Sequence, residues 1–171
     1  GHTVVPLSRE RPYAQQGLER LDAVVHLAGE AISQRWNATS KARILSSRVD
    51  GTRALCEAIA ASTPRPRVLI VASAVGIYGD RGDESLNESS ARGSGFLSDV
   101  CSAWESSADA ARAARVRVVH ARFAPILTPA GGALKSMLPP FRAGLGARFG
   151  SGAQWMPWVS IDDAVGAVLH A

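Results

Sequence analysis

The chain has 171 residues, a net charge of +4 at pH 7 and 46% hydrophobic residues, values that suit one soluble globular domain. No apolar run reaches the length of a membrane helix, and the basic residues, all arginines except Lys41 and Lys135, form no block of like charge. We therefore expect neither a membrane nor a nucleic-acid partner, whereas a solvated arginine-rich surface and arginines that meet a phosphorylated ligand both stay open.

Apolar patterning predicts strands and helices in alternation. Strands are predicted over residues 3–7, 22–27, 67–72 and 116–122, the last continuing irregularly to 127. Helices are predicted over residues 37–61, 98–114 and from Ser160, an N-cap, onward. The connections are predicted to be loop-like or weakly helical over 8–20, a polar loop over 79–95 and an irregular lobe over 131–158. This order favours an α/β fold with a parallel sheet covered on both faces.

Both ends of the chain favour an internal fragment of a longer protein. The first predicted strand begins two residues after Gly1, and no signal-peptide pattern precedes it. At the other end, an apolar helical pattern over 164–169 runs to Ala171 without a stop signal. We therefore expect a doubly wound sheet that is truncated at both ends.

The cysteines and histidines show no metal-ligand spacing. Cys56 and Cys101 lie in separate predicted helices, and the histidines are scattered. We expect both cysteines to be buried as small apolar side chains in a protein of the reducing cytoplasm, and we expect no metal site.

The strand end at residues 71–80 (VASAVGIYGD) is the place where chemistry is expected. An apolar run there passes into small residues and a Gly-x-x-Gly turn, which is typical of a buried parallel strand that opens onto a loop. Ligands of open α/β sheets bind outside the carboxyl ends of such strands. Ser73 and Tyr78 are therefore candidate site residues.

Several segments carry motifs that are specific when taken together. They are residues 24–30 (VVHLAGE), 72–79 (ASAVGIYG), 96–105 (FLSDVCSAWE), 131–134 (GGAL), 138–146 (LPPFRAGLG), 150–158 (GSGAQWMPW) and 161–163 (IDD). With these motifs the chain resembles the extended, atypical short-chain dehydrogenase/reductase superfamily. Within it, the chain is most similar to a branch of NAD(P)-dependent epimerase-family proteins, sometimes labelled as cell-division inhibitors.

The resemblance implies a Rossmann-like fold with a smaller substrate lobe. The nucleotide fingerprint of that fold, Gly-x-x-Gly-x-x-Gly, is not in the chain and would lie just before Gly1. Residues 1–171 would then form a partial NAD(P)-binding domain, to which residues 131–158 add part of the substrate lobe. We expect the isolated piece to be unstable or to bind cofactor poorly, because the sheet would lack its central strand.

The resemblance also implies a dinucleotide cofactor. Ser8 and Arg9 end the first predicted strand, where an acidic side chain would favour NAD and an arginine suits the 2′-phosphate of NADP. Residues 3–8 contain no acidic residue, and Glu10 comes one position late. We expect NADP, with NAD as the alternative; Arg9 could also be an ordinary exposed arginine.

Two further strand ends would contact this cofactor. Leu27, Ala28 and Gly29 resemble the family turn that lies against the adenosine ribose, and Gly29 would allow close backbone approach. Glu30 either caps the next segment or touches the ligand. After the last predicted strand, the resemblance places three residues near the nicotinamide, although a bent strand end forced by a proline is an equal alternative. These residues are Phe123, Ala124 and Ile126.

A substrate pocket is expected on the lobe side of the site. The resemblance places Gln154, Trp155 and Trp158 there, with Tyr78 at its edge. The two tryptophans either form an apolar pocket or plug the space between lobes, and Tyr78 fits the anchoring of a loop better than the role of an acid.

The acid/base pair of the superfamily is missing from the chain. Family enzymes use a Tyr-x-x-x-Lys pair, in which the lysine favours the phenolate, and no such pair exists here. The expected tyrosine and lysine positions fall near Val100 and Trp104. Ser73 is the candidate catalytic hydroxyl, although the corresponding position could equally be Ala74.

Two functions are compatible with these residues. The first is an NAD(P)-binding oxidoreductase or epimerase-like protein that acts on an unidentified small molecule without the usual acid/base pair. The second is a non-catalytic NADP-binding sensor or regulatory module. The retained pocket motifs favour the first, and the missing pair favours the second. The oligomeric state stays open.

Overall fold

The computed structural model describes residues 1–148 and 150–171, which form an α/β fold around a parallel sheet in the order β1-β2-β3. The strands of this sheet are β1 (Ala23–His26), β2 (Val68–Ala74) and β3 (Arg117–Phe123). A second parallel pair joins β4 (Ile126–Leu127) to β5 (Val159–Ser160). The helices are α1 (Ala38–Ala61), α2 (Phe96–Ser106), α3 (Asp109–Ala113), α4 (Gly132–Arg142) and α5 (Ile161–His170).

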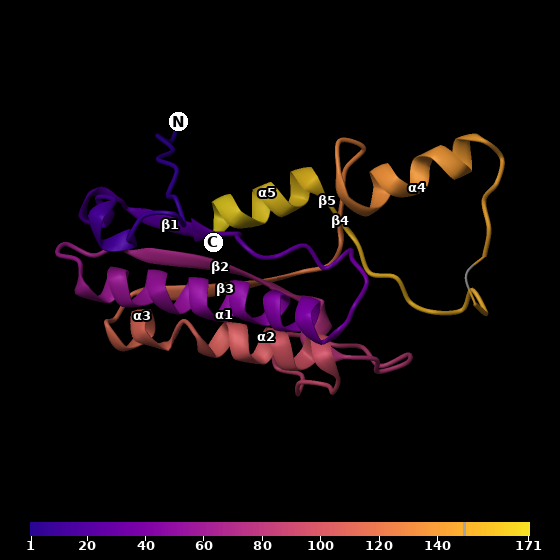
Figure 1. The fold of residues 1–171 in the computed structure, drawn as a ribbon, viewed down its shortest axis with the longest axis horizontal. Helices are drawn as coiled ribbons and strands as arrows, with labels where there is room; N and C mark the ends of the chain where they lie inside the picture. Colours follow the sequence, from indigo (N-terminus) through magenta and orange to yellow (C-terminus); the bar gives the residue numbers. More distant parts are fainter. Residues whose placement is uncertain (149) are drawn as a thin grey trace.

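One face of the sheet is covered by α1, α2 and α3, and α5 lies over the other face (Figure 1). The core on the covered face joins the apolar stripe of α1 to the sheet and to α2 and α3. Its fully buried members include Leu55, Ile59, Leu69 and Val71. Both cysteines are buried and free, as predicted for small apolar side chains.

Side-chain caps fix where two of the helices begin. Before α1, Asn37 and Ser40 form a capping box with reciprocal hydrogen bonds of 2.8 Å. Before α5, the Ser160 hydroxyl accepts a hydrogen bond of 3.0 Å from the Asp163 N–H, which confirms the predicted N-cap.

The predicted first strand is wrong. Residues 1–8 form no regular structure, and a cavity of about 840 Å³ separates residues 1–7 from β1. A strand needs a hydrogen-bonded neighbour, and the segment does not reach the free edge of β1. The segment 8–20, predicted as loop or weak helix, contains the short 3₁₀ helices η1 (Tyr13–Gln15) and η2 (Leu18–Arg20).

Two helix predictions need correction. The helix predicted over 98–114 is interrupted at Ser107, whose hydroxyl donates to the Trp104 carbonyl and competes with the regular backbone pattern. The lobe predicted as irregular contains α4. Pro139 and Pro140 stand in the last turn of α4, where each lacks the N–H that would bond the carbonyl four residues earlier, and the helix ends at Arg142.

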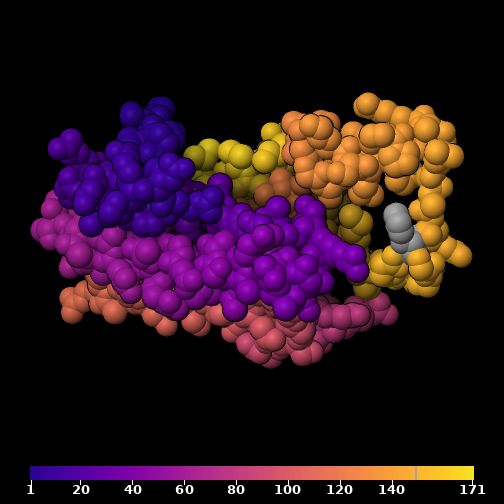
Figure 2. All heavy atoms as spheres, viewed as in Figure 1, coloured from indigo at the N-terminus to yellow at the C-terminus, as the bar shows by residue number. Residues whose placement is uncertain are grey.

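The segment that carries α4 projects beyond the body formed by the sheet and α1–α3 (Figure 2). It connects to that body through β4 and β5, which pair Ile126 with Val159. In the part of the chain that the structure describes, no helix is long and apolar enough to cross a membrane.

Candidate functional site

The candidate site lies where the parallel strands β1, β2 and β3 end. Leu27–Glu30 follow β1, Ser73 and Ala74 end β2, and Phe123 ends β3 in register with Ala74. Parallel strands bring their carboxyl ends to one edge, so these predicted residues share that edge although they lie far apart in the sequence.

Ser73 is buried in a charged network rather than left open to a ligand. Ser73 is only 4% exposed, and its hydroxyl donates a hydrogen bond of 2.7 Å to Glu105 Oε1. Glu105 also accepts two hydrogen bonds of 2.9 Å from the Arg122 guanidinium. The serine proton is therefore directed at a carboxylate on α2.

Glu105 stays ionised in this network. Burial opposes its charge, but hydrogen bonds from Arg122 and Ser73 outweigh burial and hold the pKa of the Glu105 carboxyl below its ordinary value. The same pairing raises the pKa of Arg122. Glu105 and Arg122 were not predicted as site residues; Glu105 stands in the Trp-Glu pair of the motif over 96–105, which was the only signal for it.

Tyr78 is held against the same arginine. It ends the 3₁₀ helix η3 (Val75–Tyr78), is buried, and its hydroxyl accepts a hydrogen bond of 2.9 Å from Arg122 Nη1. Arg122 also donates to the Glu88 carbonyl at 3.2 Å. Tyr78 and the loop over 79–95 are thus fastened to one guanidinium, an arrangement that suits loop anchoring.

Packing occupies the positions where the acid/base pair was sought. Val100 and Trp104 on α2 are buried, and the Trp104 indole N–H donates to the Thr52 hydroxyl at 2.9 Å. Cys101 lies between them, and burial raises the pKa of its thiol. None of these side chains offers a readily titrated proton near neutral pH.

Gly29 makes room for an arginine of α1. A Cβ at Gly29 would lie 3.0 Å from Cζ of Arg48 and 3.2 Å from each Nη. Arg48 Nη1 donates to the Glu30 carbonyl at 2.9 Å, and Cζ lies 5.1 Å from the Trp104 ring centroid. Sequence reasoning missed Arg48, because the contact joins residues 19 positions apart on different elements and no local pattern marks it.

Glu30 is tied to α1. Its backbone N–H donates to the Ser47 hydroxyl at 2.9 Å, and its carboxylate accepts from Gln34 at 3.2 Å and lies 3.7 Å from Arg43. Ser8 is fixed by Gln16 through two hydrogen bonds of 2.7 Å. Arg9 is exposed and lines the cavity beside β1 together with Leu27 and Ala28.

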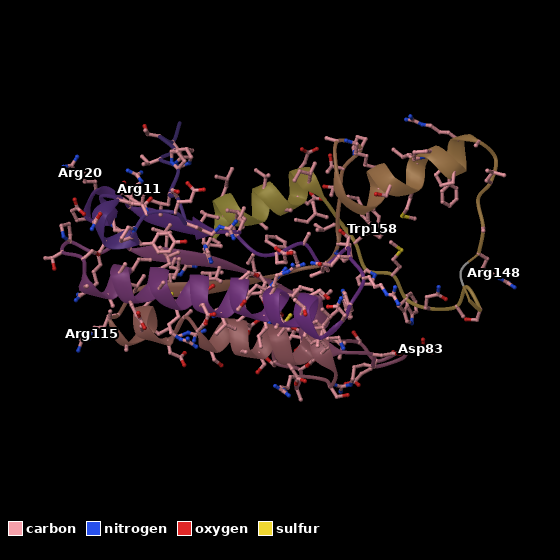
Figure 3. The ribbon with its side chains drawn as sticks, in the orientation of Figure 1. Arg11, Arg20, Asp83, Arg115, Arg148 and Trp158 are labelled. Atoms are coloured by element: carbon pink, nitrogen blue, oxygen red, sulfur yellow. The ribbon has the colours of Figure 1, made fainter. Side chains whose placement is uncertain are left out.

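The predicted substrate residues come from the projecting segment. Trp155 and Trp158 are 75% and 62% exposed, and Gln154 is exposed beside them. The Trp155 indole donates to Asp83 Oδ1 at 2.7 Å, which joins this stretch to the loop after β2. Figure 3 shows Trp158 close to β4 and β5, and Asp83 in the loop below it.

The residues proposed near the nicotinamide are only half-buried. Phe123 ends β3, Ala124 follows it, and Ile126 begins β4, where it pairs with Val159. Pro125 bends the chain between the two strands, and its carbonyl accepts from the Val159 N–H at 3.2 Å. These residues therefore also connect the sheet to the projecting segment.

Comparison with known proteins gives consistent matches. The sequence model of the NAD dependent epimerase/dehydratase family matches residues 14–171. Epimerase family protein Mb2239 of Mycobacterium bovis is 39% identical over 99% of this chain and 61% of its own length. The chain thus spans about three-fifths of that relative.

Two solved structures share both fold and sequence with the chain. Human epimerase family protein SDR39U1 (isoform 2), crystallised with NADPH, superimposes with a TM-score of 0.83 at 36% identity, covering 92% of this chain and 55% of that protein. The nucleoside-diphosphate sugar epimerase from Corynebacterium glutamicum gives 0.75 at 41% identity, covering 88% and 31%.

Proposed function

Because the chain belongs to the NAD-dependent epimerase/dehydratase family, we propose that its Rossmann-like sheet binds NADP(H) across the carboxyl ends of β1, β2 and β3. The observation that carries this proposal is the 36% identity and matching fold with a relative crystallised with NADPH. The protein would act on an unidentified small molecule as an oxidoreductase or epimerase-like enzyme, in the reducing cytoplasm.

The cofactor side of the proposal assigns roles to the strand ends. Arg9, with Ser8, takes the 2′-phosphate, for which a guanidinium is suited by charge and geometry. Leu27, Ala28 and Gly29 lie against the adenosine ribose, with Glu30 beside them. The nicotinamide end of the cofactor lies at the end of β3, against Phe123, Ala124 and Ile126. Residues 1–171 supply part of this nucleotide-binding domain.

The substrate side is formed by the segment 131–158 and the loop after β2. Trp155 and Trp158 supply apolar surface, Gln154 supplies an amide, and Tyr78 stands at the edge of the pocket. The hydrogen bond from Trp155 to Asp83 supports this proposal, because it brings the two segments together.

The reaction would run without a Tyr-x-x-x-Lys pair. Bound NADP(H) would supply hydride chemistry, and the protein would position the reacting groups and exclude water. Ser73 is the one hydroxyl at the end of β2 that could orient a substrate oxygen. A ligand oxygen would have to compete with Glu105 for that proton.

The competing function is an NADP-binding sensor that catalyses nothing. The engagement of the Ser73 hydroxyl by Glu105 favours it, because this leaves no uncommitted acid at the end of β2. Turnover distinguishes the two functions, since both require cofactor binding.

Titration of the full-length protein with NADPH and NADH, followed by nucleotide fluorescence, tests the shared premise. We expect tighter binding of NADPH. Oxidation of NADPH to NADP+ with reduction of an added ketone or aldehyde to the alcohol, the proton coming from solvent, would support the enzyme; binding without any such oxidation would support the sensor. Failure to bind either nucleotide would contradict both functions.

A further inference from the structure

Arg48 presents a half-buried charge at the ends of β1 and β2. Its guanidinium lies against Gly29, since Cζ and both Nη atoms are 3.0–3.2 Å from where a glycine Cβ would stand. Because these three distances are nearly equal, the flat face of the guanidinium is turned toward that position. Nη1 is used by the carbonyls of Glu30, at 2.9 Å, and Ile44, at 3.2 Å.

The charge of Arg48 lacks a carboxylate partner within the described residues. Arg48, Arg81 and Arg122 are the most buried arginines of that part of the chain, and of these three only Arg48 forms no ion pair there. The charge of Glu30 raises the pKa of Arg48, but the Glu30 carboxylate is engaged by Gln34 and Arg43, and burial still leaves the pKa of Arg48 lowered. A half-buried cation without a direct ion pair is costly, and a bound anion would reduce that cost.

The guanidinium also keeps hydrogen-bonding capacity. Neither Nε nor Nη2 of Arg48 donates to an acceptor on residues 1–148 or 150–171. By contrast, Arg122 directs all three of its nitrogen atoms at Glu105, Tyr78 and Glu88. Of these two arginines beside the site, Arg48 is the one with donors left for a ligand.

The surroundings of Arg48 place these donors beside the proposed cofactor site. Gly29 belongs to the turn after β1, and Trp104 and Cys101 belong to α2, which packs on β2. The Cys101 thiol lies beside the backbone of Ala74 and close enough to Arg48 to raise the pKa of that guanidinium. Ligands of open α/β sheets occupy the crevice outside such strand ends.

We propose that Arg48 binds an oxyanion of the ligand through its Nε and Nη2 groups, an inference that rests on the proposed function. The oxyanion is either a phosphate of the dinucleotide or a carboxylate or phosphate of the substrate. The guanidinium is already ordered by the two Nη1 hydrogen bonds and by the Trp104 ring, so it loses little conformational freedom when it binds such a group.

The test uses Arg48→Met and Arg48→Lys in the full-length protein, with Arg53→Met as the matched control. Arg53 lies on the same helix, is about half exposed and pairs with Asp50. Two titrations are measured: NADPH by its fluorescence, and inorganic phosphate or malonate added to the protein with and without saturating NADPH. Thermal melts show whether each variant is folded, and Arg48→Gln replaces Arg48→Met if the latter does not fold.

A loss of NADPH affinity of tenfold or more in Arg48→Met, partly restored in Arg48→Lys, assigns the oxyanion to the cofactor. Unchanged NADPH affinity with loss of phosphate or malonate binding assigns it to the substrate. Changes within twofold of Arg53→Met in both titrations overturn the proposal. If the unmutated protein binds no NADPH, the proposed function fails, and phosphate binding to the free protein still decides the role of Arg48.

Discussion

Arg122 holds Glu105 with two parallel hydrogen bonds, Nε to Oε1 and Nη2 to Oε2, each 2.9 Å long. The pair links the end of β3 to α2, and its side chains are only 24% and 13% exposed. A guanidinium that bonds both oxygens of a carboxylate holds that carboxylate in one orientation and also balances its charge. Since Ser73 and Tyr78 bond to the same pair, the end of β2 depends on it.

Replacing Glu105 with glutamine should destabilise the fold by about 2–4 kcal/mol, because Arg122 would keep a partly buried charge without its partner. Urea unfolding at pH 7 measures this loss. Asp99→Asn is the matched control, since Asp99 also lies on α2 and pairs with an arginine, Arg92, but both side chains are more than half exposed. Equal losses in the two variants would contradict the role given to the Glu105–Arg122 pair.

Stability should fall in two separate pH windows. Burial and the nearby Arg9 charge lower the pKa of His26 from 6.5, so the unfolded state binds the proton first and stability declines as pH drops below 6.5. The pKa of Glu105 is lowered from 4.5, so its contribution is present above pH 4.5 and is lost as pH falls through its folded-state pKa.

Two variants test which residue causes the loss of stability in each pH window. Urea unfolding between pH 7.5 and pH 3 should show a shallower upper decline in His26→Leu, though not its removal, because burial also lowers the pKa of His120. Glu105→Gln should flatten the lower decline. An upper decline that is unchanged in His26→Leu would mean that His26 is not protonated on unfolding in this window.

Gly93→Ala should destabilise the loop after β2. A Cβ at Gly93 would lie 2.0 Å from the Tyr78 carbonyl oxygen, and the Gly93 N–H donates to the Ile77 carbonyl at 2.9 Å. Backbone cannot yield as a flexible side chain can, so we expect a loss of more than about 2 kcal/mol. Gly51→Ala, in the middle of α1 with nothing within 4 Å, should instead gain about 0.5–1 kcal/mol. Thermal melts that rank the two variants the other way round would refute the close approach.

The sequence predicted the elements whose signals are local. Apolar runs marked β1, β2 and β3 to within a few residues, and Ser160 marked the start of α5. The segment 3–7 has a strand-like composition, but composition does not show whether a neighbour is within hydrogen-bonding reach. In α4, glycine and proline hid a helical spacing of apolar residues.

The location of the site could be predicted from the sequence, but its side-chain contacts could not. The rule that ligands bind at the carboxyl ends of parallel strands selected the ends of β1, β2 and β3. It could not reveal that the Ser73 hydroxyl points to Glu105, or that Arg48 fills the space above Gly29. Both depend on how α1 and α2 pack on the sheet, which a single sequence does not specify.

Arg9→Ala should weaken NADPH binding at least tenfold and leave NADH binding within twofold, because only NADPH carries the 2′-phosphate that a guanidinium would pair with. Fluorescence titration of the full-length protein at fixed ionic strength measures both constants. Arg11→Ala is the matched control, since Arg11 is exposed two positions further along the same segment and should leave both affinities unchanged. An equal loss of affinity for NADPH and NADH would show that Arg9 acts through the net charge of the site or through local structure. An unchanged preference for NADPH in Arg9→Ala would place the 2′-phosphate against another residue.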